Sequence, residues 1–126
     1  MNYERFLQDV LNTGIVRDRE SADAVVKAVL GILASRMTED QARRLTENLP
    51  EPLTLEELRS HQNYVLNISP EEYTVTIMNQ FSLDEDQARA LIDTVLLATK
   101  DTVGKDMYEE LKEHLPADWA KVFEEV

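Results

Sequence analysis

The chain has 126 residues, of which 43% are hydrophobic and 30% are charged, and this is typical of a single folded domain. It contains no cysteine, which excludes disulfide frameworks, thiolate catalysis and cysteine-based metal sites. Its 13 Lys and Arg against 25 Asp and Glu give a net charge of −12, which disfavours binding to nucleic acid or to anionic lipid. We expect one domain over residues 1–126.

The charge is uneven along the chain. Residues 1–63 carry a net charge of −3, whereas residues 64–126 carry −9. This excess acid keeps a protein soluble, and it also offers a negative face to a basic partner. No apolar run approaches the roughly 20 residues that a membrane-spanning helix needs, and the N-terminus lacks the basic and then apolar order of a secretory signal. We expect a cytoplasmic protein that binds neither nucleic acid nor membranes.

Apolar residues near the start of the chain follow the spacing of two helices. In residues 3–11 they recur at i, i+3 and i+4, and Gly14 then predicts a stop. A longer unbroken stripe predicts the core face of a helix over about residues 19–36. The members of this stripe are Ala22, Val25, Val26, Val29, Leu30 and Leu33.

Two capping boxes predict the next helix starts. In a capping box, the N-cap side chain and a residue three positions later each bond to the other's backbone N–H. The first has Thr38 as N-cap with Gln41 bonding back, and its helix is closed by Pro50. The second spans residues 54–57 and starts a helix that reaches Leu66. The segment between the halves is therefore expected to be ordered rather than a flexible linker.

Two more capping boxes open helices in the second half. The box at 69–72 has Pro70 at the first helical position, where its missing N–H costs nothing, and it predicts a helix over residues 70–80. The box at 82–85, with Ser82 as N-cap, predicts a helix that reaches about residue 101.

The chain closes with two shorter predicted helices. Gly104 follows the long helix, and residues 106–114 form the next one, which Pro116 stops. A short last helix is expected to carry Trp119, Val122 and Phe123.

The strongest pattern is self-similarity at a fixed offset of 66 residues. The stripe of the 19–36 helix aligns with a second stripe, and Leu49-Pro50 aligns with Leu115-Pro116. The sequence therefore predicts an all-α fold, a compact bundle of about eight helices built from two pseudo-symmetric four-helix repeats, about 3–66 and 70–126. The second stripe consists of Ala88, Leu91, Ile92, Val95 and Leu96.

Three stretches of core residues carry a resemblance to a known family. They are Phe6-Leu7-x-x-Val10, the run over residues 28–37, and the run over residues 42–50. Together they resemble the bacterial family called domain of unknown function 2267, over nearly the whole chain. The chain departs from the family pattern over residues 51–69, because this segment predicts a helix here, whereas the resemblance implies a looser connection that contains Pro and Gly. The resemblance implies a small helical protein of duplicated build, and it implies no activity, catalytic residue or cofactor.

No group of residues in the sequence matches a catalytic, nucleotide or metal site. The two histidines, His61 and His114, lie in different repeats, and Glu110 beside His114 lacks the second imidazole of a zinc-binding helix. The acidic run 84–86 begins like a calcium loop, but its sixth position holds Arg89 where that loop needs glycine. We therefore expect no metal or cofactor and lean against an enzyme.

One basic spot stands in the less acidic half, formed by Arg36, Arg43 and Arg44. The simpler interpretation pairs these arginines with neighbouring carboxylates at helical spacing. The functional interpretation makes them a docking point for an acidic partner, such as the acidic second half of another copy.

Two hypotheses on function remain open. The first is a non-catalytic helical interaction module that binds a protein partner or itself. The alternative is a small-molecule-binding or enzymatic domain with a pocket at the seam between the two repeats. Thr99 and Tyr108 are candidates for lining that pocket, because Leu33 and Ala42 are apolar at the aligned positions. Ordinary divergence between the repeats also accounts for both.

Overall fold

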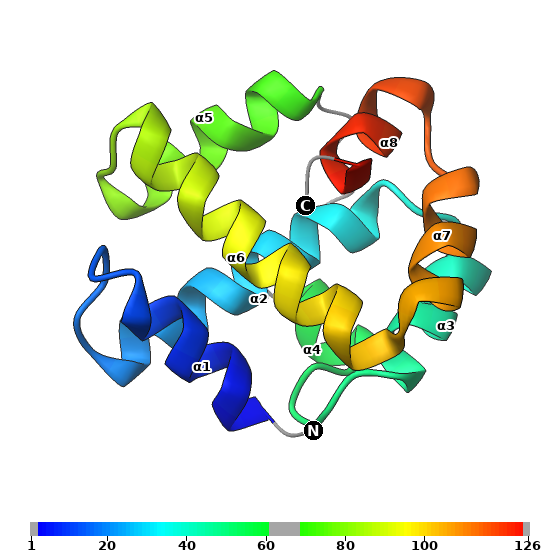
Figure 1. Cartoon of the computed structure of the whole chain (residues 1–126), viewed down its shortest axis with the longest axis horizontal. Helices are drawn as coiled ribbons and strands as arrows, with labels where there is room; N and C mark the ends of the chain where they lie inside the picture. The colour runs from blue at the N-terminus through cyan, green and yellow to red at the C-terminus, as the bar shows by residue number, and fades with distance from the viewer. Residues whose placement is uncertain (1–2, 61–68, 125–126) are drawn as a thin grey trace.

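The computed structural model describes residues 3–60 and 69–124, and in these residues it contains eight α-helices and no strand (Figure 1). The predicted all-α class is confirmed. None of the described helices is long and apolar enough to cross a membrane. In chain order the helices are α1 (Tyr3–Asn12), α2 (Arg19–Ser35), α3 (Glu39–Glu47), α4 (Leu55–Ser60), α5 (Pro70–Phe81), α6 (Glu85–Val103), α7 (Lys105–Glu113) and α8 (Ala117–Glu124).

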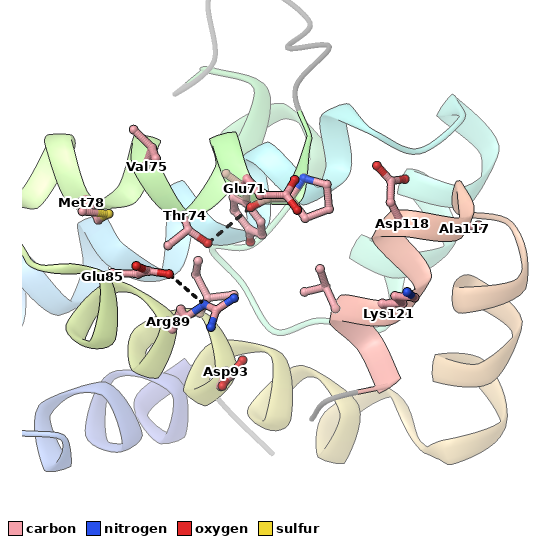
Figure 2. Close-up of a pocket in the computed structure, with 14 residues that line it drawn as sticks. Glu71, Thr74, Val75, Met78, Glu85, Arg89, Asp93, Ala117, Asp118 and Lys121 are labelled. Atoms are coloured by element: carbon pink, nitrogen blue, oxygen red, sulfur yellow. Dashed lines mark hydrogen bonds and ion pairs between the residues drawn. The ribbon is translucent and has the colours of Figure 1, made fainter.

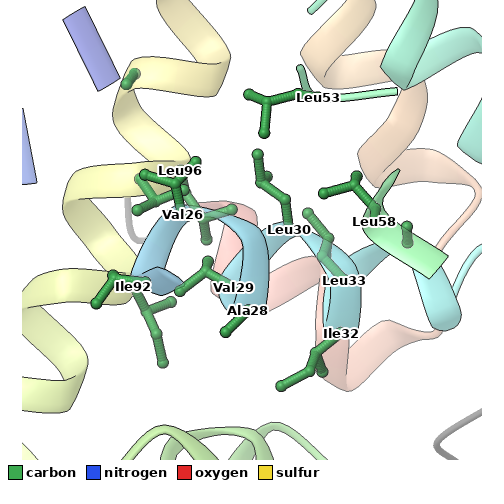
Figure 3. Packing of buried hydrophobic residues seen from close by; sticks show 14 of the residues in the cluster. Val26, Ala28, Val29, Leu30, Ile32, Leu33, Leu53, Leu58, Ile92 and Leu96 are labelled. Carbon is green, nitrogen blue, oxygen red and sulfur yellow. The ribbon is translucent and has the colours of Figure 1, made fainter. Parts of the chain in front are cut away.

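The two long helices, α2 and α6, cross at the centre of the molecule and carry its core (Figure 1). Every member of the predicted α2 stripe is fully buried, and the aligned residues of α6 are at most 3% exposed. Figure 3 shows Val29 and Leu30 of α2 packed among Ile92 and Leu96 of α6 and Leu58 of α4. Because β-branched residues such as Val29 have low helix propensity, this packing is what stabilises α2.

The first and third capping predictions have different outcomes. At α5 the box is complete: Glu72 N–H donates to Ser69 Oγ over 3.2 Å, and Ser69 N–H donates to the Glu72 carboxylate over 3.1 Å. At α3 only half of the box forms. Gln41 N–H donates to Thr38 Oγ1 over 3.2 Å, but the Gln41 amide oxygen is buried and accepts no hydrogen bond among the described residues.

The capping box predicted at 82–85 is wrong. Ser82 instead ends α5, with the left-handed backbone angles φ 56° and ψ 52°. In that conformation the N–H groups of Ser82 and Leu83 both donate to Met78 O, so the end of α5 is satisfied. The N-cap of α6 is Asp84, two residues later, and it forms a reciprocal box with Gln87. Because Ser82 is the C-cap of α5, it cannot also be the N-cap of α6.

The predicted helix over residues 55–66 is described only in its first part. Thr54 Oγ1 accepts from Glu57 N–H over 3.1 Å at the start of α4, as the second box predicts. Leu55 and Leu58 are buried on the inner face, together with Leu53 just before the helix. Residues 61–68, which include His61 and the predicted end of the helix, lie outside the described residues.

The bounds of corresponding helices follow the offset of 66 residues at several points. α2 and α6 begin 66 residues apart, and α3 and α7 begin and end 66 residues apart. Polar contacts between the two halves include Arg5 with Asp101 at 2.6 Å, the Tyr73 hydroxyl donating to Val29 O at 2.8 Å, and Arg44 with Glu110 at 2.9 Å. A two-fold relation between the halves in space stays a prediction.

Candidate functional site

A cleft of about 580 Å³ opens between α5, α6 and α8, all of which belong to the second half (Figure 2). Its size falls in the range of ordinary ligand and peptide-binding sites. α5 contributes residues at i, i+3, i+4 and i+7, which is one continuous face of a helix. These are Glu71, Thr74, Val75 and Met78.

The inner part of the cleft is apolar. Ile92 of α6 is only 3% exposed, and Met78 of α5 and Val122 of α8 are half-buried beside it. Val75, on α5, keeps 48% of its surface exposed and is one of two large hydrophobic residues so exposed in the described part of the chain. The cleft therefore presents apolar surface that the chain itself leaves in contact with water.

Charged side chains surround this apolar surface, and acids outnumber bases. Figure 2 shows carboxylates from three helices around the cleft: Glu71 on α5, Asp93 on α6 and Asp118 on α8. Glu85 is a fourth, and it pairs with Arg89 at 3.8 Å. With Arg89 and Lys121 as the cations among the lining residues, the formal charge of the cleft is −2.

A buried aromatic pair lies between α5 and α8 beside the cleft. The rings of Tyr73 and Trp119 lie 4.9 Å apart, and both residues are about 99% buried. Burial raises the pKa of the Tyr73 phenol well above its usual range, and the negative charge of Asp93 acts in the same direction. The phenol therefore stays neutral and holds its hydrogen bond to Val29 O, which fixes α5 against α2.

The two residues predicted to line a pocket at the seam lie in the core. Thr99 is fully buried and its hydroxyl donates to Val95 O over 2.8 Å. Tyr108 is 1% exposed, stacks on Phe123 with ring centroids 4.4 Å apart, and donates to Phe123 O over 3.4 Å. Neither side chain lines the α5–α6–α8 cleft.

The three arginines of the predicted basic spot occupy different surroundings. Arg43 is exposed and pairs with Glu39 at 3.2 Å, one helical turn away. Arg44 forms a two-pronged pair with Glu110 of α7. Arg36 is the half-buried C-cap of α2, and its backbone N–H donates to Leu33 O. Arg43 also lines a smaller cavity of about 360 Å³ beside α4.

The other candidate, His114, lies at the exposed end of α7. Its Nδ1 is 3.0 Å from Glu110 O, while the Glu110 carboxylate binds Arg44. Among residues 3–60 and 69–124, no three His, Asp or Glu side chains are grouped so that they could hold a metal ion.

Part of the cleft could have been recognised in the sequence, from the apolar residues on the outer face of α5. Val75 and Met78 lie on the face of α5 that also holds Glu71 and Thr74, away from the core residues Tyr73 and Ile77. An apolar pair on an otherwise polar face marks a surface for contact, but the contribution of α8 depends on tertiary packing.

Comparison with family models gives one match. The family described as "Uncharacterized conserved protein (DUF2267)" matches residues 3–122. No curated protein and no solved structure matches the chain. The matched range includes every helix described above up to the last turn of α8. The chain therefore belongs to this family of uncharacterised conserved proteins, as the resemblance in its core residues predicted.

Proposed function

We propose that this protein is a non-catalytic interaction module that docks a segment of a protein partner in the cleft between α5, α6 and α8. The observation that carries the proposal is the exposed apolar surface of the cleft. Val75 is 48% exposed and lines the same cleft as Met78, Ile92 and Val122. Burying such a surface against a partner is favourable, at about 25 cal/mol for each Å² removed from water.

The composition of the cleft also suits a protein partner. Interfaces of this kind combine an apolar centre with a polar rim, and the charged groups of the rim set specificity and association rate more than affinity. Here Glu71, Asp93 and Asp118 stand around the apolar centre. With a net charge of −12, the chain is least suited to nucleic acid as that partner.

The test compares two substitutions at equally exposed apolar positions. Val75 and Leu97 are both 48% exposed, but only Val75 lines the cleft. Wild type, Val75→Asp and Leu97→Asp would each be immobilised and used to capture proteins from the native host, with mass spectrometry as the readout. We expect a partner that wild type and Leu97→Asp retain and that Val75→Asp loses. Identical capture by all three proteins contradicts docking in the cleft.

A second docking surface and a second kind of ligand are the alternatives to this proposal. The arginine spot, Arg36, Arg43 and Arg44, is a second candidate for docking an acidic partner, and Arg43→Glu tests it in the same capture experiment. A small molecule is the alternative occupant of the cleft. Native mass spectrometry of the protein purified from its host would support that alternative if wild type retained a ligand that Val75→Asp lost.

A further inference from the structure

A thioether lines the cleft between α5, α6 and α8. It belongs to Met78, which is half-buried on α5, and Figure 2 shows its side chain among those around the cleft. Met37 and Met107 are also partly buried against the core, but they do not line this cleft. Because the chain contains no cysteine, its methionines are the only sulfur groups that an oxidant can modify.

The first half of the chain has leucine at the position aligned with this methionine. The buried Val10 of α1 aligns with Ile77 of α5, 67 residues later, and Leu11 therefore aligns with Met78. Both Leu11 and Met78 are half-buried against the core. Leucine and methionine have similar volumes, so either fills such a position, but methionine brings a sulfur atom that can be oxidised.

We infer that Met78 is an oxidation site that controls docking in the cleft. The inference rests on the proposed function and adds a means of regulating it. As a thioether, Met78 belongs to the apolar lining together with Val75, Ile92 and Val122. As a sulfoxide, it places a polar oxygen within that lining, and an apolar partner surface has no donor for this oxygen.

The oxidant is a hydroperoxide, with hydrogen peroxide as the simplest member of the class. The sulfur lone pair of Met78 attacks one peroxide oxygen, so that an S–O bond forms as the O–O bond breaks. Sulfur loses two electrons, which reduce the peroxide, and the proton on the transferred oxygen leaves with the other oxygen as water. Methionine sulfoxide reductases reverse the change with a thiol as reductant, one enzyme acting on each sulfoxide epimer.

The first measurement asks which methionine of the folded protein is oxidised. Purified protein is treated with hydrogen peroxide, and mass mapping of its peptides follows the gain of one oxygen atom at each methionine. We expect Met78 to be oxidised faster than Met37 and Met107, since it faces an open cleft, while the circular dichroism spectrum stays helical. Oxidation of Met78 that is no faster than that of the other two, or that requires loss of helix, contradicts the inference.

The second measurement compares partner capture before and after peroxide treatment of wild type, Met78→Leu and Met107→Leu. All three untreated proteins should capture the partner equally, because leucine conserves the volume of methionine. After treatment, wild type and Met107→Leu should capture about tenfold less, since docking would bury an oxygen that has no donor. Met78→Leu should keep its partner, although its remaining methionines meet the same peroxide. Treatment of oxidised wild type with both reductases should restore capture.

The outcomes separate this inference from the proposed function. Capture by wild type that peroxide leaves unchanged overturns control by Met78, and docking in the cleft survives that result. Equal losses by wild type and Met78→Leu assign the effect to another methionine and also overturn the inference. If untreated wild type captures no partner that Val75→Asp loses, the proposed function is contradicted, and control of docking by Met78 fails with it.

Discussion

The two halves of this molecule place three helices each around a shared space, and they treat that space differently. In the first half, α1, α2 and α4 are joined by Tyr3, Asp23, Lys27 and Glu57. In the second half, α5, α6 and α8 leave a cleft of about 580 Å³. The difference lies in charged residues and not in the core, because the buried stripes of α2 and α6 align without a gap.

The contrast concerns where charged side chains join helices and where they remain exposed. A network of hydrogen-bonded charges inside one half rigidifies its helices. In the second half, Tyr73 and Trp119 are buried, whereas Val75 and Asp93 are exposed to water. Under the proposed function, the first half would have a structural role and the second half would bind the partner.

The largest expected effect comes from a charge placed in the core, on α2 or on α6. Val29 of α2 and Val95 of α6 are 0% and 1% exposed, and a carboxylate at either position would be buried without a partner. Val29→Asp and Val95→Asp should each lower the free energy of unfolding by about 3 to 5 kcal/mol. Thermal and urea unfolding measure the change, and the exposed Leu97→Asp serves as control. Melting curves that both core substitutions leave unchanged would show that different helix faces are inside.

A smaller effect tests the buried hydrogen bond from Tyr73 to Val29 O, which is one of the contacts between the halves. The Tyr73 hydroxyl donates to Val29 O over 2.8 Å in a fully buried site, so Tyr73→Phe leaves that carbonyl oxygen without its side-chain donor. We expect a loss of about 1 to 1.5 kcal/mol. Tyr108→Phe is the matched change within the second half, where the bond to Phe123 O is 3.4 Å long, and it should cost less. Urea unfolding of the two variants ranks them, and the reverse order contradicts the expectation.

The third prediction removes the charge that joins α2 to α4 in the first half. Lys27→Met keeps the length of the side chain but removes the charge between Asp23 and Glu57, and it should cost about 1 kcal/mol. Burial lowers the pKa of the Lys27 ammonium, but hydrogen bonds to Asp23 and Glu57 and their charges outweigh burial, and the net pKa is raised.

The pH dependence of this contribution follows from the raised pKa. Below the ordinary lysine value of 10.5, the contribution of Lys27 to stability is complete, and it is lost as the pH rises through the folded-state pKa. Stability measured across the alkaline range should therefore fall more steeply for wild type than for Lys27→Met. Parallel curves would show that the ammonium does not hold the first half together.

The smallest effect concerns the turns after α1 and α5. Both turns contain a left-handed residue, Gly14 with φ 73° in the first half and Ser82 with φ 56° in the second. Ser82→Gly removes the steric cost of a side chain in this conformation and should stabilise the protein by about 0.5 to 1 kcal/mol. Gly14→Ala should destabilise it by a similar amount. Thermal melts of both variants check the two signs, and a shift of the same sign in both would contradict the argument.

Much of the fold was predictable because core residues follow the helical period closely. The stripe from Ala22 to Leu33 and the aligned residues of α6 are buried as predicted, and the helix predicted over residues 70–80 forms. The exact start of α6 was not predictable from the capping pattern. Ser82 and Asp84 both fit that pattern, and only the end of the preceding helix decides between them.

The candidate site was less predictable than the core. Thr99 and Tyr108 were selected because they are polar at positions where the aligned residues are apolar, but their hydroxyls are satisfied by Val95 O and Phe123 O inside the core. A polar side chain on a buried stripe can bond within its own helix, and sequence spacing does not show this. The cleft depends on where α8 lies against α5, and Trp119 packs on Tyr73 where these helices meet.

The ion pair between Arg44 and Glu110 has a consequence for the ancestry of the chain. The two residues are 66 positions apart, which is the offset that relates the two halves in sequence, and they bind each other. In a dimer of identical units, a residue at such a position would meet its own copy, and two arginines or two glutamates would repel each other. Under the predicted duplication, joining two units in one gene would remove this constraint, because each copy could then mutate separately. The pair would then be a contact that two identical units could not make.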